Sequence, residues 1–159
     1  MKGVVFLFLL CLPLIRHNNH QTGSVQSIST GLERIEIIRM KPGTDMLEGL
    51  NNFIKEKKIK NAVIIAGVGS VTDYRYHVVS DKNLPPAEEF PKASVAMDLT
   101  SVQGYILNGK IHAHITLSDA NSMVGGHLES GTKALTFFIL TIGVLPDKLD
   151  LENFDNNKF

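Results

Sequence analysis

The stretch from Gly109 to Ser118 reads GKIHAHITLS and alternates aliphatic side chains with polar ones. In a β-strand, successive side chains point to opposite faces of the sheet. One face therefore carries Ile111, Ala113, Ile115 and Leu117, and the other carries His112, His114, Thr116 and Ser118. The alternation predicts a half-buried strand that presents two histidines on its polar face.

A third histidine follows after a short turn, in the segment Gly125-Gly126-His127-Leu128. Neutral imidazoles are common ligands of divalent metals. Zinc prefers four tetrahedral ligands, so three histidines leave one position for water, a carboxylate or a substrate atom. The sequence thus predicts a divalent-metal site, with zinc as the first candidate, on His112, His114 and His127. Exposed or hydrogen-bonded histidines without a metal are the alternative.

The glycines around His127 have a separate, structural interpretation. Gly125, Gly126 and Gly131 allow a positive φ or a close crossing of strands. Either property would shape the backbone so that it aims His127 at the other two histidines.

The rest of the chain contains one convincing helix, at about residues 44–57, with Thr44 available as N-cap and Asp45 in the first turn. Apolar and β-branched segments predict strands, and Asn108-Gly109 is a strong hairpin turn. The expected strands lie at about residues 32–40, 62–71, 74–79, 95–102, 104–107, 110–118 and 134–144. The fold class is therefore α+β, with a mainly antiparallel sheet of about six or seven strands and one principal helix.

Length and composition suit one compact domain, which we expect at residues 32–146. The 159 residues include 16 basic and 16 acidic side chains, so the formal net charge is zero. No global field draws in nucleic acid or an anionic membrane. Cys11 is the one cysteine, so a disulfide within the chain is excluded.

The two ends of the chain differ from this domain. Residues 1–20 resemble a signal peptide, because Met1-Lys2 precedes an apolar run that is too short to span a membrane comfortably. They predict a secreted or periplasmic protein without a stable membrane span in the mature chain; a cytoplasmic protein with an upstream extension is the alternative. Residues 21–31 read as a linker, and residues 147–159 as a loosely packed C-terminal tail.

Four features together resemble the PPC (plants and prokaryotes conserved) domain family, over about residues 32–144. They are Gly67-Val68-Gly69-Ser70, Asp98 placed six residues before Gly104, His112-Ala113-His114-Ile115-Thr116-Leu117 and Gly125-Gly126-His127-Leu128-Glu129-Ser130-Gly131. The resemblance implies a sandwich-like α+β fold that assembles as a homotrimer. It also puts His112, His114 and His127 at ligand positions, and Asp98 where relatives commonly have Glu.

Several functions remain open at this stage. A metal ion with an open coordination position could act on a small molecule. Asp98 could then be a further ligand, an outer group that orients a ligand, or the base that accepts a proton from metal-bound water. DNA binding is implied by descriptions of prokaryotic relatives, but the arginines are scattered and the AT-hook core of the plant proteins is missing. A structural or interaction module without metal is the third reading. It rests on the apolar run at residues 137–140, which we expect to be covered on both sides or buried between subunits.

Overall fold

The computed structural model describes residues 19–22 and 25–155, in two units that divide between Thr30 and Gly31. Residues 1–18, which hold most of the segment that resembles a signal peptide, lie outside this range. In the first unit, β1 (Asn19–Thr22) pairs antiparallel with β2 (Val25–Ile28). A linker was expected here, because this short polar segment has no apolar period and its pairing depends on backbone hydrogen bonds.

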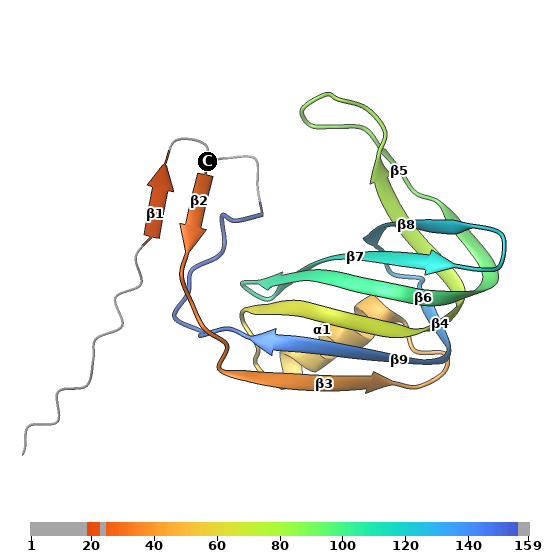
Figure 1. Cartoon of the computed structure of the whole chain (residues 1–159), viewed down its shortest axis with the longest axis horizontal. Coiled ribbons are helices and arrows are strands. Elements are labelled where there is room, and N and C mark those ends of the chain that lie inside the picture. Colours follow the sequence, from red (N-terminus) through yellow and green to blue (C-terminus); the bar gives the residue numbers. More distant parts are fainter. Residues whose placement is uncertain (1–18, 23–24, 156–159) are drawn as a thin grey trace, which may run out of the picture. The chain divides into compact units, whose positions relative to one another are not determined.

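The second unit is an α+β domain, which confirms the predicted fold class. Its elements are β3 (Arg34–Met40), α1 (Met46–Glu56), β4 (Ala62–Val79), β5 (Glu88–Glu89), β6 (Lys92–Leu107), β7 (Lys110–Ser118), β8 (Met123–Leu128) and β9 (Lys133–Val144). The seven strands form one antiparallel sheet in the order β3-β9-β4-β6-β7-β8, with β5 paired to β4. Figure 1 shows α1 behind β4, β9 and β3.

Two long strands replace pairs of shorter strands that the sequence predicted. β4 continues through residues 67–69, where the two glycines predict a bend or a bulge, and its register against β9 shifts between Ile64 and Ala66 and again between Gly69 and Val71, as at a bulge. A Cβ at position 67 would lie 2.6 Å from a methyl of Leu140 on β9, so glycine is needed there for β4 to run on beside β9. The glycines therefore let the neighbouring strands approach instead of ending β4.

The far end of β4 closes part of the sheet on itself. β8 pairs with β7 on one side, and on the other side it pairs with β4 through Tyr76 opposite Leu128 and His77 opposite His127. β4, β6, β7 and β8 are thereby joined in a closed circuit of hydrogen-bonded neighbours. This closure brings residues of β4 next to the histidine-bearing strands.

The N-cap of helix α1 lies one residue later than predicted. Asp45 is the N-cap, with extended backbone, and its carboxylate accepts the N–H of Glu48 at 3.0 Å. The expected cap, Thr44, instead uses its backbone carbonyl to accept the N–H of Ala134. Met46, Leu50 and Ile54 form the buried face of the helix, whereas the helical spacing pointed to Leu47 with Leu50 and Ile54; Leu47 is only partly buried.

The C-terminal segment is packed against the domain, contrary to the loose tail expected from its acidic and amide residues. Leu149 and Leu151 are buried, and the amide of buried Asn61 donates to the carbonyl of Leu149 at 2.9 Å. The alternation of two leucines was too short a pattern to stand out in the sequence. This packing carries Asp155 back to the sheet.

The face of the sheet opposite α1 keeps several aliphatic side chains exposed. Ile35 and Ile37 of β3 are 57% and 75% exposed, and Ile65 and Val68 of β4 are about half exposed. On β9, Phe138 and Leu140 are buried while Phe137 and Ile139 are partly exposed. Within one chain, the apolar run at residues 137–140 is therefore covered on one side only. Among the described residues, no helix combines the length and apolarity needed to cross a membrane.

Candidate functional site

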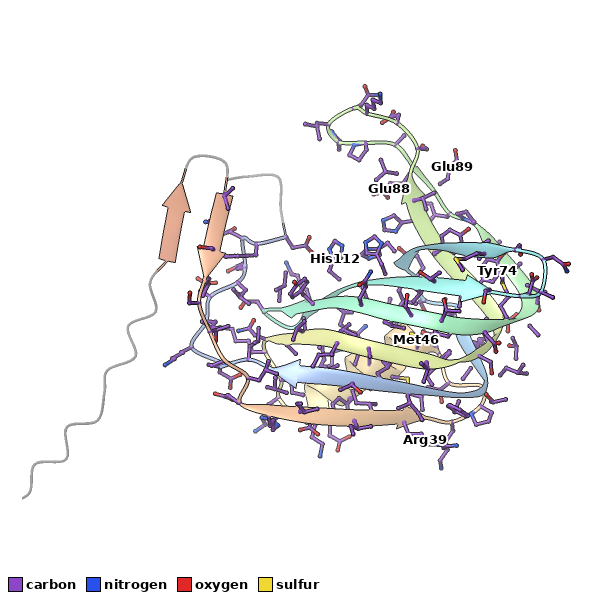
Figure 2. All side chains as sticks on the ribbon, in the orientation of Figure 1. Arg39, Met46, Tyr74, Glu88, Glu89 and His112 are labelled. Carbon is purple, nitrogen blue, oxygen red and sulfur yellow. The ribbon has the colours of Figure 1, made fainter. Side chains whose placement is uncertain are left out.

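Strand β7 has the two faces that its sequence predicted. Ala113, Ile115 and Leu117 are at most 2% exposed and belong to the core. His112 and His114 lie on the opposite face and reach solvent. Figure 2 shows His112 on the side of β7 that faces β5, where Glu88 lies.

Three histidines form a row across three adjacent strands. His114 of β7 lies directly opposite His127 of β8, and His127 lies directly opposite His77 of β4. Directly paired residues point to the same face, with Cβ atoms about 4.5–5.5 Å apart. His112, two residues before His114, joins the same face. His77 could not be predicted as a site residue from local patterns, because its pairing with β8 joins segments 50 residues apart.

The imidazole rings are in contact. The Nε2 atoms of His112 and His114 are 3.3 Å apart. The His127 ring centroid lies 4.7 Å from that of His112, 5.4 Å from that of His114 and 4.4 Å from that of His77. One ligand nitrogen from each of His112, His114 and His127 lies within 4.8 Å of the others. The structure thus brings together the three histidines that the sequence singled out.

Glycines make this close approach possible. A Cβ on Gly126 would lie 2.5 Å from the carbonyl oxygen of His77, and one on Gly125 would lie 2.3 Å from the carbonyl oxygen of Ile115. Both contacts are far too short for a side chain, so β8 fits between β7 and β4 only with glycine at these positions. Gly131 differs, because it has a positive φ of 112° and free space around it up to Arg75.

Carboxylates hold two of the rings in place. Nδ1 of His112 is 2.9 Å from Oδ1 of Asp155, and Nδ1 of His77 is 2.7 Å from Oε1 of Glu129. An ionised carboxylate only accepts hydrogen bonds, so both Nδ1 atoms carry the proton. Nε2 of His112 is then left with its lone pair toward His114. The Asp155 contact could not be predicted from local sequence patterns, because it depends on the packed C-terminal segment.

Two of the histidines are biased toward the neutral form. Burial lowers the pKa of His114 below its usual value of 6.5, and the neighbouring His112 and His77 lower it further. Burial also lowers the pKa of His127, with further lowering by His77, His112 and His114, while Glu129 opposes the shift. Neutral rings are the form that binds metal.

Asp98 is not brought to the histidines. It lies on β6 opposite Ser118 of β7 and Ser70 of β4. Ser118 is four residues from His114 along β7, which corresponds to about 13 Å of strand. Neither group of potential metal ligands in the described part of the chain includes Asp98.

A pocket of about 490 Å³ opens beside the histidines. Its lining comes from three neighbouring strands of the outer face: Val63, Ile64, Ile65, Gln103, Gly104, Tyr105, His112 and His114. Two imidazoles at one end and aliphatic side chains at the other give the pocket a polar and an apolar part.

Comparison with known families agrees with this architecture. The Plants and Prokaryotes Conserved (PCC) domain matches residues 28–146. The chain belongs to this family. The match spans every element of the second unit from β3 to β9, together with the four motifs noted in the sequence.

Solved structures share the PCC domain fold with this chain. A metal-containing protein from Archaeoglobus fulgidus has a TM-score of 0.67 at 18% identity, covering 76% of this chain and 86% of its own. A Bacteroides thetaiotaomicron protein described as a "putative DNA binding protein" has a TM-score of 0.64 at 19% identity, covering 84% and 86%. A plant- and prokaryote-conserved protein from Pyrococcus horikoshii has a TM-score of 0.63 at 22% identity, covering 82% and 89%.

One curated relative is a much longer protein than this chain. The bifunctional protein GlmU of Synechococcus sp. (strain JA-3-3Ab) is 24% identical over 120 residues. The match covers 75% of this chain and 18% of the curated relative, so this chain spans about a fifth of that protein's length.

Proposed function

We propose that this chain binds a divalent metal ion, zinc in the first instance, through His112, His114 and His127. The observation that carries the proposal is the 3.3 Å separation of the Nε2 atoms of His112 and His114. Two nitrogens bound at 2.0–2.1 Å to a tetrahedral zinc ion are about 3.3–3.4 Å apart. These two rings therefore need little movement to share an ion. The ligand nitrogen of His127, which lies within 4.8 Å of the other two nitrogens, has to move closer to them.

The protonation of the rings supports the same proposal. Asp155 fixes the proton of His112 on Nδ1, which leaves Nε2 as the ligand atom. Carboxylates in this outer position are typical partners of metal-ligating histidines. The lowered pKa values of His114 and His127 keep these rings free of an extra proton near neutral pH.

The role that we propose for the ion is to hold a small molecule. Three histidines leave one tetrahedral position for water or a ligand atom. The pocket of about 490 Å³ begins at His112 and His114 and continues over Val63 and Ile65. A ligand with one metal-binding group and a small apolar body fits this arrangement. Asp98 is left out of the proposed site because of its distance along the strand.

We further propose that the chain forms a homotrimer through the exposed aliphatic face of β3, β9 and β4. Ile37 is 75% exposed although it lies in the middle of a strand, and Ile35, Ile65 and Val68 on the same face of the sheet are also exposed. Contiguous exposed apolar side chains of this kind are typical of protein interfaces. The family resemblance supplies the number of subunits.

DNA binding is the second candidate, and it is favoured by the description of the Bacteroides neighbour. The formal net charge of zero gives it little electrostatic support. Retention on duplex DNA that falls steeply with added salt would support DNA binding. Equal retention of the chain on DNA-loaded and empty resin would refute it.

We propose that the protein is exported, on the basis of residues 1–20 alone. The apolar run after Lys2 supports it. N-terminal sequencing of the protein from the soluble fraction of expressing cells tests it, because export predicts a first residue beyond the apolar run and a cytoplasmic protein predicts Met1 or Lys2.

Metal content tests the main proposal. We expect about one zinc ion per chain after purification without a histidine tag and dialysis against zinc, and a loss of at least tenfold in affinity in His114→Ala and His127→Ala. Thr116→Ala, on the same face of β7, is the matched control and should bind as the original chain does. A folded protein that takes up no zinc, or variants that bind as tightly as the control, would overturn the proposal.

A further inference from the structure

A second group of metal-binding side chains lies on the other side of His127. It consists of His77, His127 and Glu129, with one ligand atom from each within 4.8 Å of the others. His77 of β4 stacks on His127 with a centroid separation of 4.4 Å. Two imidazoles and one carboxylate are a donor set that zinc uses in proteins.

The carboxylates around His77 prepare it for an ion. Its Nδ1 proton is donated to Glu129 at 2.7 Å, and its Nε2 lies 3.8 Å from Oε1 of Glu88. An ion between Nδ1 and the Glu129 carboxylate displaces that proton. A neutral ring keeps one proton, which then resides on Nε2 and faces Glu88. Glu88 thereby becomes the outer carboxylate that holds the ring, as Asp155 does for His112.

We propose that His77, His127 and Glu129 form a second, alternative position for the divalent ion. The inference rests on the proposed function, because both positions share His127. A neutral imidazole has one lone pair, so His127 serves one ion at a time. The three-histidine position is preferred, since filling the second position breaks the hydrogen bond between His77 and Glu129.

The decisive experiment removes the preferred position and asks whether an ion still binds. Zinc calorimetry and elemental analysis of the untagged full chain should give one ion for the original protein. The double variant His112→Ala/His114→Ala should still bind one ion, with lower affinity. Adding His77→Ala or the milder Glu129→Gln to the double variant should abolish binding, while thermal unfolding of the metal-free proteins verifies that each variant is folded.

The role of Glu88 can be tested with a matched control, because Glu89 lies next to it on β5. In the double-variant background, Glu88→Gln should weaken zinc binding roughly 10- to 100-fold through loss of the outer carboxylate, whereas Glu89→Gln should leave it unchanged.

The outcomes separate this inference from the proposed function. An original chain that binds one ion, together with a folded double variant that binds none, overturns the second position and leaves the three-histidine site intact. Two ions on the original chain overturn the alternative occupancy. A double variant that binds zinc as tightly as the original chain supports the second position and overturns the three-histidine site.

Discussion

Asp155 accepts a hydrogen bond at 2.9 Å from Nδ1 of His112, across 43 residues of sequence. The contact links the end of the described chain to the proposed metal centre, and it fixes which nitrogen of His112 faces His114. The C-terminal segment reaches this point because Leu149 and Leu151 are buried in the domain. A segment without recognisable motifs therefore helps to set up the site.

Asp155→Asn should weaken zinc binding roughly 10- to 100-fold, because an amide in this position no longer fixes the proton on Nδ1 and no longer supplies negative charge. Thermal unfolding of the metal-free protein should change little, since the His112–Asp155 pair is exposed. Zinc calorimetry checks the prediction. Glu152→Gln, in the same segment, is the matched control, and equal affinities in the two variants would refute the role of Asp155.

Gly126→Val should destabilise the metal-free protein by about 1–3 kcal/mol and should also weaken zinc binding. The new side chain collides with the carbonyl of His77, so β8 moves away from β4 and takes His127 with it. Gly31→Val is the control, because a Cβ there meets nothing within 4 Å. Chemical denaturation and zinc calorimetry measure the two effects. A Gly126 variant that is destabilised yet binds zinc with full affinity would break the proposed link between strand packing and the site.

The stability of the metal-free protein should fall as the pH drops below about 6.5. The pKa values of His114 and His127 are lowered by folding, so the unfolded chain takes up protons first as the pH falls. Their contribution is fully present above the unfolded value of 6.5 and is lost toward the folded values. Denaturation curves between pH 5 and 8 test this, with His114→Gln/His127→Gln as the comparison. An identical pH slope in the variant would contradict the assignment to these two rings.

Ile37→Glu should convert the proposed trimer into monomers at micromolar concentration, because it places a charge in the centre of the proposed interface. Leu84→Glu is the control, since Leu84 is 87% exposed in the loop before β5 and lies outside the aliphatic face. Light scattering gives the masses. Trimers in both variants would show that the subunits contact each other through another surface. A monomeric wild-type protein would refute the proposed trimer.

The parts of this protein that could be predicted from sequence depend on local patterns. The alternation in β7 gave the right faces for His112 and His114, and Asn108-Gly109 forms the expected turn with positive φ at both residues. The 3.6-residue period gave α1, although its cap was placed one residue early because Thr44 and Asp45 are both good capping residues.

The parts that were missed depend on long-range pairing. His77 enters the site only because the far end of β4 pairs with β8, and no local period reveals that partner. Asp155 depends on burial of two leucines beyond the last strand. Asp98 illustrates the opposite case, because the family resemblance suggested a role near the metal while its register on β6 places it toward the other end of β7.

Anomalous X-ray scattering at the zinc edge tests most directly whether the three histidines hold one ion. Crystals of the original chain grown with one equivalent of zinc should show a peak about 2.0–2.1 Å from Nε2 of His112, Nε2 of His114 and one nitrogen of His127. Ordered rings at this place with no anomalous peak between them would contradict the account.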